Sequence, residues 1–137
     1  MNTPKTKGVH HIGLTVSKLE ESAAFFTDLL EWKEVKRDPD YPAIFVSDGT
    51  IMVTLWKNKE GKNKPVPVEF NKNSNIGLHH VAFTVEHMQE LDDIYKKLQA
   101  NQVKIEFAPE LLRDGHAKHM MCYEPSGIRV EFICPGV

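Results

Sequence analysis

The residues with the clearest chemical potential in this sequence are two pairs of adjacent histidines and one glutamate. The pairs, His10-His11 and His79-His80, each open a segment in which apolar residues alternate with small or polar ones. Glu131 lies in a third such segment, where a lone carboxylate is costly to bury without a partner. Two neutral imidazoles and one carboxylate around a cation leave coordination positions open, as a catalytic metal requires. Whether these groups can meet depends on the elements that carry them.

The two histidine pairs belong to an internal repeat. Residues 8–19 read GVHHIGLTVSKL, residues 77–88 read GLHHVAFTVEHM, and the two segments align without a gap. Such a repeat indicates two copies of one supersecondary unit. In each copy the alternation has the period of two that is typical of a strand with one apolar face.

The alternation distinguishes the two histidines of each pair. Because neighbouring strand residues point to opposite faces, His10 and His79 should share the apolar face that a following helix covers. His11 and His80 should lie on the opposite, more polar face. In the last apolar segment Glu131 likewise lies opposite Val130. The pattern therefore predicts a divalent-metal site built from His11, His80 and Glu131. The alternatives are histidines that bond only to the backbone at strand starts, and an Arg129 that pairs with Glu131.

The remaining pattern predicts the element order β-α-β-β-β twice, in a single α+β domain. We expect a first helix over 19–30 with Ser17 as its N-cap, and a second with an apolar face from Leu91 to Leu98. The expected later strands are 43–46, 51–56, 103–107, 118–123 and 128–134. Module one then spans about 8–57, a linker about 58–76, and module two about 77–134 of the domain 1–137.

Alternation also selects side chains that should line the same face as the metal residues: His119, Met121, Tyr123, Met52 and Trp56. His119 is the candidate acid or base beside the site, since imidazole changes charge near neutral pH. A partly exposed histidine beside a loop is the alternative for His119, and plain packing is the alternative for Met52, Trp56 and Met121. His87 and His116 are expected at the surface.

Composition narrows the functional class. The chain has 137 residues and a formal charge of −2, which favours neither nucleic acid nor an anionic membrane as a partner. Residues 1–7 are polar and predict no signal peptide, so we expect a cytoplasmic protein. Cys122 and Cys134 lack a metal or redox spacing and are expected as reduced thiols.

The motifs HHIGLTV, HHVAFTV and YEPSGIRVEF resemble the vicinal oxygen chelate superfamily, which groups glyoxalases, bleomycin-resistance proteins and extradiol dioxygenases. The resemblance implies two βαβββ modules that form a cupped, incompletely closed mixed β-barrel around a metal, and often a homodimer. It implies ligands from the first and last strand of each module, which match His11, His80 and Glu131. The fourth position is Thr54, a vacant ligand position because a hydroxyl is a poor ligand and no base near neutral pH.

Thr54 disfavours glyoxalase I and epimerase chemistry, which needs a base. The extradiol dioxygenases carry a tyrosine where this chain has Met121, and the fosfomycin transferases carry a threonine where it has Gly13. The first hypothesis is therefore a metal-dependent dioxygenase, lyase, isomerase or transferase acting on a small oxygen-bearing molecule. Its cofactor would be one divalent ion, Fe²⁺, Mn²⁺, Ni²⁺, Co²⁺ or Zn²⁺. The alternatives are a metal-free protein that binds a small molecule, like the bleomycin-resistance members, and a structural or regulatory module that keeps remnants of a site.

Overall fold

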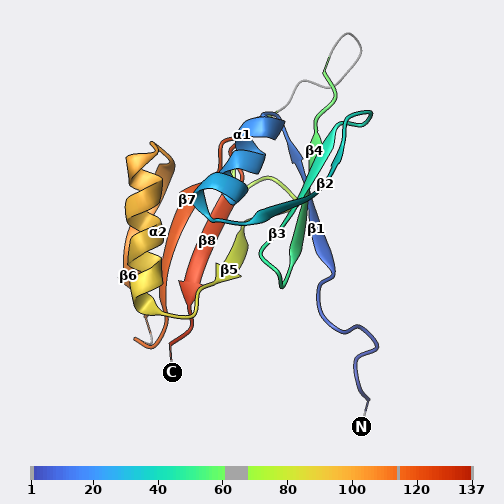
Figure 1. Cartoon of the computed structure of the whole chain (residues 1–137). Helices are drawn as coiled ribbons and strands as arrows, with labels where there is room; N and C mark the ends of the chain where they lie inside the picture. The colour runs from blue at the N-terminus through green and yellow to red at the C-terminus, as the bar shows by residue number, and fades with distance from the viewer. Residues whose placement is uncertain (1, 61–67, 114, 137) are drawn as a thin grey trace. The chain divides into compact units, whose positions relative to one another are not determined.

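The computed structural model describes residues 2–60, 68–113 and 115–136. The chain divides into two compact units, Met1–Asn58 and Lys59–Val137. Each unit holds one predicted module, and we call them module one and module two. The strands and helices follow the order β-α-β-β-β in both (Figure 1). The predicted pair of βαβββ modules is thus confirmed.

Module one is a four-stranded mixed sheet with one short helical segment. Its strand order is β1-β4-β3-β2, in which β1 and β4 are parallel and the other pairs are antiparallel. The helical segment begins as an α-helix and continues as a single π-helical stretch. The elements are β1 (His11–Val16), α1 (Leu19–Ala24), η1 (Phe25–Leu29), β2 (Lys33–Asp38), β3 (Ala43–Ser47) and β4 (Met52–Lys57).

Module two repeats this topology with a longer helix. Its strand order is β5-β8-β7-β6, again with a parallel pair of first and last strands. Figure 1 shows α2 lying along one face of this sheet. The elements are β5 (Val81–Thr84), α2 (Met88–Ala100), β6 (Lys104–Leu111), β7 (Lys118–Tyr123) and β8 (Arg129–Cys134).

The cores follow the predicted alternation. In β1, Leu14 and Val16 are buried whereas Gly13 and Thr15 are exposed. In α2, Leu91 and Leu98 are fully buried, and each contributes about 1.5 to 3 kcal/mol of hydrophobic free energy. In these elements the buried side is therefore the apolar one, as alternation and helical spacing predict.

Two local predictions were wrong or stay open. Ser17 does not cap the first helix: the N-cap is Lys18, which makes no side-chain capping bond, and its carbonyl accepts the Ser22 N–H. The predicted linker over 58–76 lies partly outside the described residues, and the prediction of one domain stays a prediction.

None of the described helices is long and apolar enough to cross a membrane.

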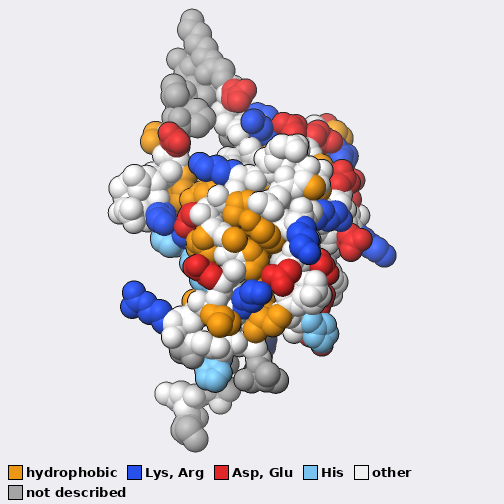
Figure 2. Space-filling model, turned by 90° about the vertical axis from the view of Figure 1, so that its left-hand side faces the viewer, with side chains coloured by type: hydrophobic (Ala, Val, Ile, Leu, Met, Phe, Trp, Pro, Cys, Tyr) orange, Lys and Arg blue, Asp and Glu red, His pale blue; other side chains and the backbone are white. Residues whose placement is uncertain are grey.

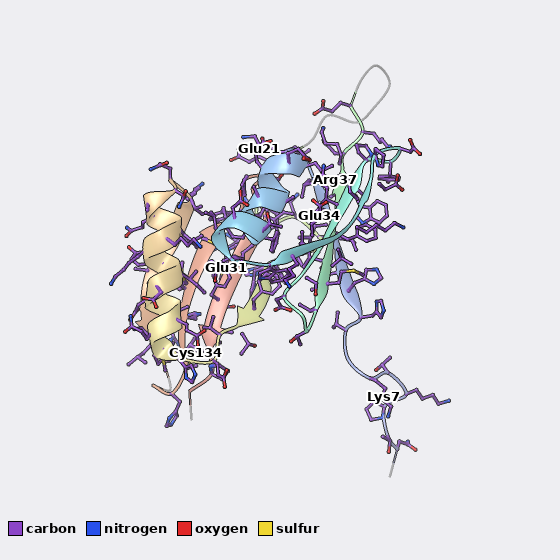
Figure 3. All side chains as sticks on the ribbon, viewed as in Figure 1. Lys7, Glu21, Glu31, Glu34, Arg37 and Cys134 are labelled. Atoms are coloured by element: carbon purple, nitrogen blue, oxygen red, sulfur yellow. The ribbon has the colours of Figure 1, made fainter. Side chains whose placement is uncertain are left out.

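The described surface mixes charges of both signs. Figure 2 shows Lys and Arg side chains interspersed with Asp and Glu over one face. In module one, Arg37 and Glu34 lie close together on β2 (Figure 3), and Arg37 also pairs with Glu20 at 2.8 Å. The side chains of all three are well exposed, so these pairs contribute little stability.

Candidate functional site

A tight turn places the last strand of module two. The Glu124 side chain is almost fully buried, and its Oε1 accepts the Ile128 N–H at 3.0 Å. The Glu124 N–H donates to the Ile128 carbonyl at 3.0 Å, and Gly127 has a φ of +92°, a conformation that favours glycine. The Glu-Pro-Ser-Gly sequence thus fixes where β8 begins, and with it the positions of Arg129 and Glu131.

Glu131 is the centre of a histidine–carboxylate cluster in module two. Its side chain is buried, and β8 pairs it in register with Ala82 of β5 and Met121 of β7. One oxygen, Oε1, lies 3.1 Å from His80 Nε2, and the other, Oε2, lies 2.6 Å from His119 Nδ1. The structure therefore brings His80 and Glu131 together, and it adds His119 on the far side of the carboxylate.

His119 is held on three sides. Its ring packs against Phe107 with 4.8 Å between the ring centroids, and its Nε2 lies 4.0 Å from Glu110 Oε1. Only 14% of the side chain is exposed. His119 is thus part of the Glu131 cluster of module two, and its role as an acid or base stays a prediction.

The donor set fits a divalent ion at the His80–Glu131 pair. Two neighbouring ligand atoms of a tetrahedral or octahedral ion at 2.0 to 2.2 Å lie about 2.8 to 3.6 Å apart. The 3.1 Å between His80 Nε2 and Glu131 Oε1 falls in that range. Imidazole nitrogen with carboxylate oxygen is also a donor set that these ions prefer.

The third predicted ligand, His11, belongs to module one and is exposed there. Within the described residues, no group of three or more His, Cys, Asp or Glu side chains is arranged to hold a metal ion. The trio His11, His80 and Glu131 therefore stays a prediction, of which module two supplies two members.

At the position equivalent to Glu131, module one carries Thr54. β4 pairs Thr54 with Gly13, as β8 pairs Glu131 with Ala82, and Gly13 and Ala82 are equivalent in the repeat. The Thr54 hydroxyl is buried, accepts the Trp56 indole N–H at 2.8 Å and donates to the Ile12 carbonyl at 3.4 Å. Both of its hydrogen-bonding functions are used within the module, in agreement with a vacant ligand position.

The face of β4 that carries Thr54 is aromatic. Trp56 packs edge-on against Tyr41 at 4.6 Å between ring centroids and against Phe45 at 5.4 Å. Met52, two residues before Thr54, pairs in register with His11. Met52 and Trp56 thus share the Thr54 face, as alternation predicts; a ligand role for either residue stays a prediction.

Arg129 does not pair with Glu131, so that alternative was wrong. Instead the buried Arg129 guanidinium makes a bidentate pair with Glu106, Nε to Oε1 at 2.8 Å and Nη2 to Oε2 at 2.7 Å. The Tyr123 hydroxyl donates to Glu106 Oε1 at 2.5 Å. Hydrogen bonds from Arg129, aided by Tyr123, lower the pKa of Glu106 to about 2. The bond to Glu106 raises the pKa of Tyr123.

Sequence reasoning did not identify Glu106. The signal was present, because Glu106 stands between Ile105 and Phe107 in a strand, the same pattern that singled out Glu131.

Sequence reasoning also placed His79 on the wrong face. β5 begins at Val81, so alternation does not extend back to His79, and the His79 ring lies 3.3 Å from Arg129 Nη1. Desolvation and the Arg129 charge lower the pKa of His79.

The other predicted residues are placed as follows. Met121 is buried and pairs in register with Glu131, while His87 and His116 are exposed, as predicted. Cys122 and Cys134 are buried free thiols, and burial raises the pKa of Cys122 to about 12. A separate open pocket of about 500 Å³ in module one lies beside the start of α1, and none of the predicted site residues lines it.

Comparison with known proteins identifies the family. Residues 8–132 match the Glyoxalase/Bleomycin resistance protein/Dioxygenase superfamily. The chain belongs to this superfamily. A catechol-2,3-dioxygenase of Bacillus subtilis (strain 168) is 32% identical over 105 residues, which cover 74% of this chain and 33% of that protein. The chain thus spans about a third of that dioxygenase. The uncharacterized protein YqjT of the same organism is 29% identical over 93% of this chain and 98% of its own length.

A solved structure supports the fold. The crystal structure of a glyoxylase/bleomycin resistance protein/dioxygenase domain from Frankia sp. EAN1pec matches with a TM-score of 0.80 and 23% identity, over 96% of this chain and 99% of that one. The predicted α+β fold of this superfamily is therefore confirmed. Members of the superfamily are glyoxalases, bleomycin-resistance proteins and dioxygenases, so membership leaves the reaction open.

Proposed function

We propose that this chain is a metal-dependent enzyme that acts on a small organic molecule with two neighbouring oxygens. The observation that carries the proposal is the 3.1 Å approach of His80 Nε2 to Glu131 Oε1, on a buried carboxylate. His80 and Glu131 would hold one divalent ion, with His11 as the third ligand because it is equivalent to His80 in the repeat. When bound, such an ion supplies Lewis acidity or, in the case of iron, reactivity toward O₂.

The residues of the chain have separable tasks in this proposal. His119 holds Glu131 Oε2 at 2.6 Å and so keeps Oε1 directed toward His80. Glu131 provides the negative charge that attracts the cation, and its burial makes that attraction stronger than in water. Thr54 offers neither a ligand nor a base, which leaves an open coordination position for the substrate oxygens.

The similarity to a catechol-2,3-dioxygenase favours oxygen chemistry on a substrate with neighbouring hydroxyls. Met121 stands where the extradiol motif carries a tyrosine, so this chain would not use a phenol at that position. Catechol is accordingly a probe for this proposal, with O₂ consumption as the measurement.

A second candidate function is metal-free binding of a flat aromatic molecule. The aromatic group of Trp56, Tyr41 and Phe45 on one face of module one supports it, because clustered aromatic rings offer a surface for another ring. In that case the Glu131 cluster would serve only to stabilise module two.

Metal analysis of protein purified without chelator distinguishes the two functions. We expect about one ion per chain in the wild type. His80→Ala and Glu131→Gln should each lower the metal affinity by more than about 100-fold, which exceeds the loss caused by mutating residues that contact the ligands but not the metal. His116→Ala, an exposed histidine in the same module, is the matched control and should retain the ion. A wild type without stoichiometric metal, or variants that hold as much as the wild type, would sink the metal proposal.

A further inference from the structure

Arg129, two residues before the candidate ligand Glu131, is buried, and its orientation is fixed. Its Nε and Nη2 are occupied by the bidentate pair with Glu106. Only 6% of the Arg129 residue is exposed, so the guanidinium has little freedom to turn away. Its remaining nitrogen, Nη1, lies 3.3 Å from His79 Nδ1.

This contact determines which nitrogen of His79 carries a proton. A guanidinium has only donors, and it stays protonated in proteins. His79 Nδ1 must therefore accept from Arg129, and an accepting imidazole nitrogen carries no hydrogen. The neutral His79 ring accordingly keeps its proton on Nε2.

The same nitrogen of His79 also determines the protonation of His80, because the two rings contact each other. His79 Nδ1 lies 2.7 Å from His80 Nδ1, a distance at which one of the two must donate. Since His79 Nδ1 accepts, His80 Nδ1 donates, and Arg129 Nη1 and His80 Nδ1 share the one lone pair of that nitrogen. The other nitrogen of the neutral His80 ring, Nε2, then presents a lone pair toward Glu131 Oε1 at 3.1 Å. Two lone pairs at that distance repel each other unless a proton or a metal ion lies between them.

We propose that Arg129 and His79 are positioning residues that fix the tautomer of His80, so that His80 Nε2 faces the cation it shares with Glu131. Metal-ligating histidines generally donate their second N–H to a fixed acceptor, and here the acceptor is another imidazole. The cation rests on the proposed function. The tautomer rests on the Arg129–His79 and His79–His80 contacts and can be tested without metal.

Module one has the same histidine pair without this constraint. His10 Nδ1 and His11 Nδ1 lie 2.9 Å apart, so one donates to the other. The position equivalent to Arg129 is Met52, which cannot donate a hydrogen bond. Among the described residues, a fixed donor of this kind therefore accompanies the histidine pair of module two and not that of module one.

Nitrogen-15 NMR of the metal-free full chain, at mildly alkaline pH, tests the tautomer directly. We expect a proton on His80 Nδ1 and none on His79 Nδ1. In Arg129→Lys, whose point-like ammonium does not reproduce the guanidinium fork, His79 should lose this preference; exposed Arg113→Lys is the matched control. A wild type in which His80 is protonated on Nε2 alone would overturn the inference, whatever metal it binds.

Titration with Co²⁺ alone tests the consequence. His79→Ala should weaken binding about 10- to 100-fold and change the visible spectrum of bound Co²⁺. His79→Asn should recover most of the affinity, because its amide oxygen can accept from both Arg129 and His80, and His116→Ala should behave as wild type. If Asn is no better than Ala, His79 does not position His80 and the inference fails. If the wild type binds no Co²⁺, the proposed function fails and the NMR result alone decides the tautomer.

Discussion

Modules one and two share their topology and their histidine pair, yet they differ in what lies beside that pair. In module two the last strand carries Arg129 and Glu131, whereas in module one the equivalent residues are Met52 and Thr54. The neighbouring face is ionic in module two and aromatic in module one, where Trp56 bonds to Thr54. One duplicated scaffold thus holds a charged cluster in one copy and a neutral, internally satisfied one in the other.

The difference shows that two copies of one repeat can hold different groups at equivalent positions. A buried carboxylate needs compensating partners, and module two supplies them in two separate sets. Glu131 has His80 and His119, while Glu106 has Arg129 and Tyr123. Among the described residues of module one, no acidic side chain is buried, and the buried Thr54 hydroxyl is satisfied by Trp56 and the Ile12 carbonyl.

Arg129→Met gives module two the residue that module one has, and we expect the largest effect on stability from it. It leaves Glu106 without the partner of its bidentate pair, and breaking a buried pair costs about 3 to 5 kcal/mol. Glu106 is 24% exposed, which favours the lower end of that range. Urea unfolding measures the loss, with exposed Arg113→Met as control. A loss below about 1 kcal/mol would mean that Glu106 is fully rehydrated and that the charge difference between the modules is not structural.

The sequence predicted the scaffold better than the clusters. Local alternation and the repeat are short-range signals, and they were sufficient for the element order and for strand 118–123. The pairing of Arg129 with Glu106 was missed, because it joins β8 to β6 across the intervening strand β7, and alternation within one strand does not show which strands are neighbours. His79 was misplaced because the strand rule was applied to a residue outside the strand. That His11 binds the same ion as His80 and Glu131 remains a prediction.

The pH dependence of the unfolding free energy should show the second difference between the modules, with a smaller effect. The pKa of Glu106 is lowered from its ordinary 4.5 to about 2, so its ionised form is favoured by folding. This contribution is fully present above about pH 4.5 and is lost as the pH falls toward 2, for a total of about 3 kcal/mol. Glu106→Gln should therefore lose less stability than wild type over this range. Glu20→Gln, from the exposed pair of module one, should follow the wild-type curve. Parallel curves for Glu106→Gln and wild type would show that Arg129 does not stabilise the ionised Glu106.

Thr54→Val should have the smallest effect and tests the vacant position directly. The substitution removes the acceptor of the Trp56 indole N–H, a donor-only group, and we expect a loss of about 1 to 2 kcal/mol. Metal content should not change, because the hydroxyl is engaged within module one. Thr15→Val, exposed on β1, is the matched control and should leave stability nearly unchanged. If Thr54→Val unfolds like wild type, water replaces the hydroxyl. If it instead lowers metal affinity, Thr54 is a ligand, and the two modules are more alike in their chemistry than their residues indicate.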